Sequence, residues 1–213
     1  MTTRQSAEPS HPGEAERGQP MLEPKTIANT GAEFRAASPA FFVQDPLAAR
    51  PWFALRLSQS LLVASVALWA TLVAFGNITD YGINYAFVQH VLAMDTIFPS
   101  ATIHYRAIAS PWLYHLAYVL IILTEVLVAV LCWWGAWRLW RRRSLPAAEF
   151  RQAKGVAILG LTLACLLWLV GFIVIGGEWF GMWMSEQWNG IQSAFRFVVV
   201  AGLALAILIL RDD

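Results

Sequence analysis

Charged residues and cysteines are both scarce in this 213-residue sequence. Asp, Glu, Lys and Arg make up only 14% of the residues, against about 25% in soluble domains. The two cysteines, Cys132 and Cys165, lie inside apolar segments and build no disulfide framework. A net charge of +1 excludes a basic nucleic-acid-binding protein. With 58% hydrophobic residues, the composition also excludes a disordered chain and indicates a small integral membrane protein.

Four long apolar segments lie at residues 57–75, 113–137, 155–175 and 191–210. A helix rises about 1.5 Å per residue, so about 20 residues cross a hydrocarbon core of roughly 30 Å. Backbone groups in lipid must hydrogen-bond within their own segment, so each segment is predicted to be helical. The predicted fold class is all-α: a polytopic membrane protein in which residues 52–213 form a bundle of four transmembrane helices.

Residues 1–51 differ from the rest of the chain. They are rich in Glu, Pro, Ala and Gly and have no sustained apolar period, so they cannot bury enough apolar surface to offset the entropy of ordering. We predict a disordered extension.

Basic residues predict the orientation of the helices. Arg141, Arg142 and Arg143 lie in the connection between the second and third segments, and the following connection has no Lys or Arg. By the positive-inside rule these arginines are the topology anchor on the cytoplasmic side. Both termini, including the extension, are then cytoplasmic, and Arg106 and Arg196 are the two basic residues left on the outer side.

The outer connection between residues 76 and 111 is long enough to be structured. It begins with turn-forming residues, and residues 84–94 then place Phe87, Val88 and Val91 at helical spacing. This spacing predicts a short amphipathic helix along the outer surface. The second outer loop, at residues 176–183, is rich in aromatic residues, and the two loops are predicted to form a lid over the bundle.

Several loop and helix segments resemble one protein family. They are residues 73–82, Asn84, Phe87, Val88, residues 90–96, 132–136, 176–180 and 188–190. These segments are similar to the bacterial family of predicted small integral membrane proteins called domain of unknown function 2165. The resemblance extends over about residues 55–210 and implies a four-span protein of the bacterial inner membrane. It implies no activity, catalytic residue or cofactor.

Glu125 lies at mid-membrane depth, 12 residues after Leu113 and about 18 Å along the helix. A carboxyl group there must face the bundle. His115, Tyr118 and Glu125 fall on one side of the helical wheel, as a polar face leading inward. One interpretation is a proton or cation site. The other is a protonated Glu125 that hydrogen-bonds Trp69, Trp168 or Thr71 and only fixes the helix packing.

A second candidate is a polar cluster on the outer face. Its predicted members are Arg196, Glu178, Asp95, His90, Asp80 and Asn77. Arg196 lies about 7.5 Å below the start of its segment and can extend its guanidinium outward. It is predicted to pair with Glu178, Glu186 or Asp95, or alternatively to bind an anion. His90 is predicted to hydrogen-bond Asp95 or Asp80.

The residue pattern predicts no metal site and no cofactor. Haem or zinc would need imidazoles that converge, and His115 is the only histidine inside an apolar segment. Cys132 and Cys165 are interpreted as small buried residues. No phosphate-binding loop, dinucleotide fingerprint, nucleophile elbow or zincin motif is present.

Two function classes follow. The first is a non-enzymatic accessory or assembly subunit in the lipid bilayer that contacts another membrane protein. The second is a small proton-coupled or solute-binding carrier using Glu125; because four helices are few for a carrier, it is predicted to be a homo-oligomer. A redox subunit is a weaker third interpretation, and no nucleic-acid partner is expected.

Overall fold

The computed structural model describes residues 51–211 and contains no strand within that range. The predicted disordered extension over residues 1–51 lies outside the described residues, except for Pro51. The helical elements are α1 (Pro51–Thr79), α2 (Tyr81–Ala93), η1 (His104–Arg106), α3 (Pro111–Arg142), α4 (Ala147–Leu166), η2 (Leu167–Trp179), η3 (Met182–Met184) and α5 (Ile191–Leu208).

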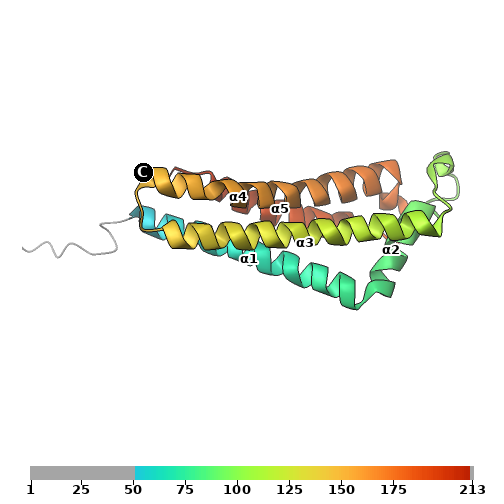
Figure 1. The fold of residues 1–213 in the computed structure, drawn as a ribbon. Coiled ribbons are helices and arrows are strands. Elements are labelled where there is room, and N and C mark those ends of the chain that lie inside the picture. The colour runs from blue at the N-terminus through green and yellow to red at the C-terminus, as the bar shows by residue number, and fades with distance from the viewer. Residues whose placement is uncertain (1–50, 212–213) are drawn as a thin grey trace, which may run out of the picture. The chain divides into compact units, whose positions relative to one another are not determined.

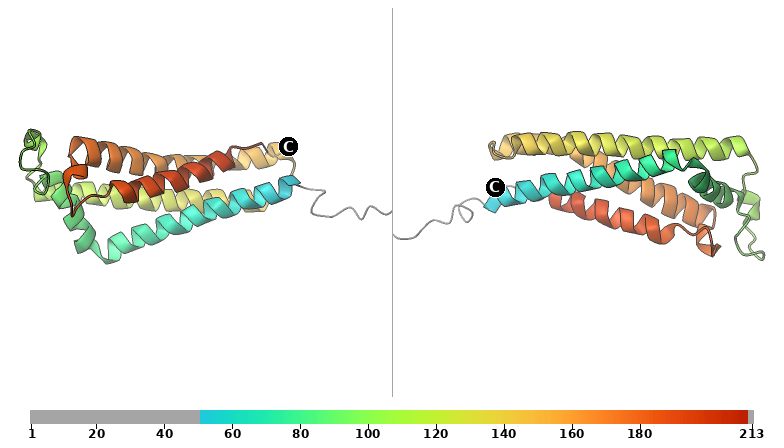
Figure 2. Two further views of the ribbon diagram at one scale, coloured as in Figure 1. Left: turned by 180° about the vertical axis from the view of Figure 1, so that it is seen from behind. Right: turned by 90° about the horizontal axis from the view of Figure 1, so that it is seen from below.

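Four helices of the described chain are long and apolar enough to cross a membrane, which confirms the predicted number of spans. They are α1, α3, the continuous helix formed by α4 and η2, and α5. Figures 1 and 2 show these helices running alongside one another. The last part of the third span, η2, is wound as a π-helix, whose hydrogen bonds join residues five apart.

Small residues let α3 and α4 approach closely. A Cβ atom added at Gly135 would lie 2.6 Å from the Cα of Ala157, and one added at Gly160 would lie 2.8 Å from Sγ of Cys132. Lipid gives no hydrophobic drive for helices to associate, so close backbone packing of this kind holds transmembrane helices together. Fully buried Ala153, together with Ala157, continues this contact along α4.

Three stacked rings connect α1, η2 and α5. Phe197 lies between Trp69, at 4.0 Å between ring centroids, and Trp168, at 4.2 Å. Trp69 lies midway along α1, and Trp168 lies inside the third span, just after α4 continues into η2; an indole ring there needs a packing partner. The stack supplies that partner and fixes the position of α5 against the other two helices.

One end of the bundle, here called the arginine end, joins the start of α1, the turn between α3 and α4, and the end of α5 (Figure 1). Side chains satisfy the terminal carbonyl groups of neighbouring helices there. Gln59 donates to the carbonyl of Ile207 at 3.0 Å, and Lys154 donates to that of Leu210 at 2.8 Å. Helix ends leave such carbonyls without intrahelical partners, so these bonds lock the end of α5 onto α1 and α4.

The opposite end, here called the cap end, begins where α1 turns into α2. The predicted short helix is confirmed, although it begins at Tyr81 rather than at residue 84. Met94 ends α2 with a left-handed backbone conformation, φ 54°. The chain then folds back, so that the N–H of Ile108 donates to the carbonyl of Leu92 at 2.9 Å. This return path places the loop beside α2 before α3 begins.

Candidate functional site

Glu125 is buried, with 2% of its surface exposed. Its partner is Asn77, near the end of α1, whose Nδ2 donates to Oε2 of Glu125 at 2.7 Å. The predicted partners were wrong. Trp69 and Trp168 stack on Phe197 instead, and the hydroxyl of Thr71 accepts a hydrogen bond from Nε1 of Trp133. Within residues 51–211, no cation forms a salt bridge with Glu125.

The three residues of the predicted polar face are linked through α1 and α2. Tyr118 donates its hydroxyl to the backbone carbonyl of Asn77 at 2.9 Å. Its ring contacts Tyr81, at 4.7 Å between centroids, and the hydroxyl of Tyr81 lies 2.8 Å from Nδ1 of His115. His115 is exposed and Glu125 is buried, so the contacts lead from the surface into the bundle. The step between the two tyrosines is a ring contact rather than a hydrogen bond.

The predicted outer polar cluster is only partly assembled. His90 and Asp95 do pair, with Nδ1 2.8 Å from Oδ2. Asn77 instead faces Glu125.

The predicted ion pair of Arg196 is not formed. Arg196, Glu178 and Asp80 are exposed, and none belongs to a salt bridge within residues 51–211. The reason for Arg196 lies in the helix geometry: it follows the buried Ala194 by two residues, which turns its side chain by about 200° from the packed face of α5.

The two loops at the cap end pack together, although residues 176–179 of the predicted second loop belong to η2 and the loop begins at residue 180. We call residues 94–110 and 180–190 the cap. The hydroxyls of Thr96 and Ser185 lie 2.9 Å apart. Arg106 donates to the carbonyl of Trp179 at 3.1 Å and also lies over its ring. The sequence predicted Arg106 only to be a charge on the outer side, and did not predict its contact with Trp179. Arg106 is the one Lys or Arg between residues 76 and 111, and this was the feature of the sequence that singled it out.

The cap has its own small core. Met94, Ile97 and Phe180 are buried there. Beside the cap, the ring of His90 stacks on Trp188 at 4.6 Å between centroids, which ties α2 to the second loop. The cap is therefore an ordered, packed structure.

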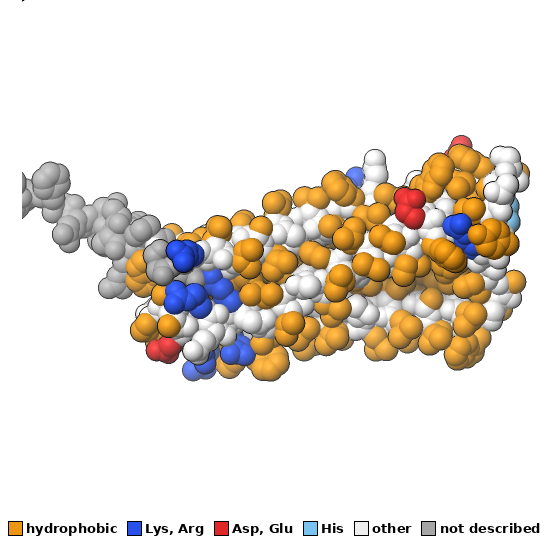
Figure 3. Space-filling view, turned by 90° about the horizontal axis from the view of Figure 1, so that it is seen from above, with side chains coloured by type: hydrophobic (Ala, Val, Ile, Leu, Met, Phe, Trp, Pro, Cys, Tyr) orange, Lys and Arg blue, Asp and Glu red, His pale blue; other side chains and the backbone are white. Residues whose placement is uncertain are grey.

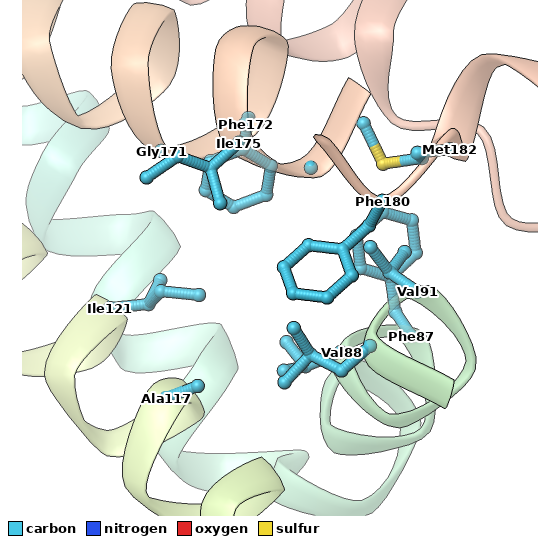
Figure 4. A pocket seen from close by; sticks show the side chains of 12 residues that line it. Phe87, Val88, Val91, Ala117, Ile121, Gly171, Phe172, Ile175, Phe180 and Met182 are labelled. Carbon is cyan, nitrogen blue, oxygen red and sulfur yellow. The ribbon is translucent and has the colours of Figure 1, made fainter. Parts of the chain in front are cut away.

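Beneath the cap is an apolar cavity of about 220 Å³ (Figure 4). It is lined by residues of α2, α3, η2 and the cap, namely Phe87, Val88, Val91, Leu92, Ala117, Ile121, Gly171, Phe172, Ile175, Gly176, Phe180 and Met182. Ile121 lies one helical turn before Glu125. The cavity was not predicted, because its walls come from segments far apart in the sequence.

The histidines do not converge. His90 pairs with Asp95, His104 lies near the carbonyl of Phe98 at 3.3 Å, and His115 contacts Tyr81. In the part of the chain that the structure describes, no group of three or more His, Cys, Asp or Glu side chains is placed to hold a metal ion. The arrangement offers instead a buried carboxyl group that can hold a proton or accept hydrogen bonds.

The structure is that of a multi-pass integral membrane protein. It has four long apolar helices, a series of polar contacts that ends at a buried carboxyl group, and an ordered cap. The chain belongs to the family described as predicted small integral membrane protein (DUF2165), whose family model matches residues 55–211. This confirms the resemblance drawn from the loop segments. No curated protein and no solved structure matches the chain.

Proposed function

We propose that this protein is a non-enzymatic accessory or assembly subunit that contacts another membrane protein through its cap. The observation that carries the proposal is the combination of order and exposure in the cap. Its two loops are fixed to each other by Thr96 and Ser185, yet Tyr105 is 78% exposed and Trp183 is 49% exposed. Aromatic side chains on a pre-organised surface are typical of protein interfaces.

The proposal includes an orientation in the inner membrane. Most basic residues of the described chain lie at the arginine end. Outside the spans, Arg106 in the cap is the exception. The positive-inside rule therefore favours a cytoplasmic arginine end and cytoplasmic termini. The cap then faces the outer side of the membrane, where it is available to a partner.

Site-specific photo-crosslinking in living cells tests this function. A photoreactive phenylalanine analogue is placed at Tyr105 or Trp183 in the cap, or at Leu72 on α1 as the control. Leu72 is 58% exposed but lies in a membrane span. We expect one discrete foreign protein to be crosslinked from both cap positions and not from residue 72. The same set of adducts from all three positions, or none from the cap, would contradict the proposal.

A second candidate function is supported by Glu125. A carboxyl group buried in a membrane helix is costly and marks a functional site by default, and here its side-chain partner is the neutral amide of Asn77. In this alternative the protein is a small proton-coupled or solute-binding carrier, acting as a homo-oligomer. The polar contacts from His115 to Asn77 would form the outer approach to the carboxyl group.

Proton flux into vesicles distinguishes this alternative. Full-length protein is reconstituted with a pH-sensitive dye inside, and Glu125→Gln keeps the hydrogen-bonding shape but cannot titrate. We expect Glu125→Gln to abolish flux, whereas Glu149→Gln, at an exposed acidic residue of α4, leaves it unchanged. Equal flux through the wild-type protein and Glu125→Gln would rule the carrier out.

A further inference from the structure

A basic pocket lies on the side of the arginine end. It has a volume of about 490 Å³ and is lined by Trp134, Trp137, Arg138, Arg141, Arg142 and Leu145. Figure 3 shows most of the visible Lys and Arg side chains at one end of the bundle, with others nearer the opposite end, and a largely hydrophobic surface between. The last turns of α3 therefore bring three guanidinium groups and two indole rings around one hollow.

The positive charge of this pocket is not neutralised within the described chain. No acidic residue lines it, and the salt bridge found within residues 51–211 is at the cap end. Arg138 lies three and four residues before Arg141 and Arg142, a spacing at which like charges on a helix repel each other. An anion between the three side chains would relieve that repulsion.

The wall of the pocket is held in place by Arg56 of α1. Its Nη1 donates to the backbone carbonyls of Arg143, at 3.2 Å, and Leu145, at 2.7 Å. Arg143 itself turns away from the pocket, since it donates to the carbonyl of Trp140 at 2.6 Å and lies over that ring. The predicted anchor of residues 141–143 is thus divided: two of its arginines line the pocket with Arg138, and the third does not.

The depth of the pocket indicates which anion it would meet. α3 has 32 residues and is about 48 Å long, which exceeds the hydrocarbon thickness of roughly 30 Å and reaches the headgroup layers. Guanidinium groups bind phosphate oxygens in a bidentate manner. The half-exposed rings of Trp134 and Trp137 provide an apolar side of the kind that sits at the membrane interface.

We propose that this pocket binds the phosphate-bearing headgroup of an anionic phospholipid. Clusters of basic residues at the cytoplasmic end of a transmembrane helix bind such headgroups, and here the pocket is formed by one face of the last turns of α3 and by Leu145 in the turn that follows. In this assignment Arg138, Arg141 and Arg142 bind the phosphate, and Arg56 is a positioning residue that fixes Leu145 and the turn. The proposal is independent of the function of the cap and of Glu125.

Lipid titration of the purified full-length protein tests the site. Native mass spectrometry in a neutral detergent measures binding of dioleoyl-phosphatidylglycerol, with dioleoyl-phosphatidylcholine and inorganic phosphate as comparison ligands. The variants are Arg138→Gln and Arg142→Gln, and the matched control is Arg143→Gln, which removes the same charge from the same helix end outside the pocket. Arg142→Lys keeps the charge without the planar guanidinium.

We expect phosphatidylglycerol to bind more tightly than phosphatidylcholine. Arg138→Gln and Arg142→Gln are each expected to weaken its binding about fivefold, Arg142→Lys to weaken it less, and Arg143→Gln to leave it nearly unchanged. An elution profile like that of the wild type in gel filtration confirms that each variant is folded. Equal weakening by Arg143→Gln, equal binding of the two lipids, or inorganic phosphate competing as well as the lipid would overturn the proposal.

Discussion

The carboxyl group of Glu125 depends on a side chain from a different helix. Asn77 lies near the end of α1, and its amide reaches the middle of α3. The backbone of the same residue accepts a hydrogen bond from Tyr118. One residue of α1 therefore satisfies two polar groups of α3, and the position of the last turn of α1 is coupled to both.

Asn77→Ala is expected to lower the free energy of unfolding by about 1–3 kcal/mol, because it leaves a buried acceptor without its donor. Unfolding of the purified protein by a denaturing detergent, followed by circular dichroism, measures the change. Ser65→Ala is the control, since the Ser65 hydroxyl bonds only the carbonyl one turn earlier on its own exposed face. The role assigned to Asn77 fails if both variants are equally stable.

For single residues, the sequence predicts whether a side chain is buried better than it predicts its hydrogen-bond partner. The depth of Glu125 in its apolar segment follows from counting residues, and its burial is as expected. Its partner could not be predicted, since Asn77 reaches it only through the path that α1 takes across α3. Likewise, the sequence around Arg196 did not show that this side chain forms no salt bridge within residues 51–211.

The helices extend beyond the apolar segments that predicted them. The first segment, residues 57–75, lies inside α1, which covers Pro51–Thr79. The added turns contain Arg56 and Asn77, and each of these side chains bonds another element. A hydropathy pattern predicts the end of a helix at polar residues, because it takes no account of their hydrogen bonds to other elements. The number of helices is thus predictable from the sequence, but their ends are not.

The contact between α3 and α4 is expected to be sensitive to a single methyl group. Gly135→Ala would place a Cβ atom 2.6 Å from the backbone of Ala157, so the helices must separate. The expected loss of stability is about 1–3 kcal/mol. Gly202→Ala is a matched control, because a Cβ atom there has no neighbour within 4 Å. Thermal unfolding in detergent should rank Gly135→Ala clearly below Gly202→Ala; the reverse order would contradict the close packing.

The ring stack that positions α5 offers a second test of packing. Phe197→Ala removes the contacts with both Trp69 and Trp168, and the two aromatic pairs together are worth about 1–3 kcal/mol. Phe195→Ala removes a ring of the same size that is 59% exposed and should have little effect. Tryptophan fluorescence during unfolding measures both variants. Equal effects would show that the stack does not hold α5.

In the whole molecule, the four spanning helices place the arginine end and the cap end on opposite sides of the membrane. We expect Thr102→Cys and Gln187→Cys, both at exposed cap positions, to react with a membrane-impermeant maleimide in intact cells. Ser144→Cys, at the exposed turn of the arginine end, should react only after permeabilisation. Replacing the natural Cys132 and Cys165 with serine first removes any background. Labelling of residue 144 in intact cells would contradict the proposed orientation.

The interhelical bonds at the arginine end have a consequence for local motion. Helix termini normally fray one at a time, but here the end of α3 is bonded by Arg56 and the end of α5 by Gln59, both on the first turns of α1. Neither terminus can open without breaking a bond to α1. The amide protons of these final turns should therefore exchange with deuterated solvent at one shared rate, as a single cooperative unit.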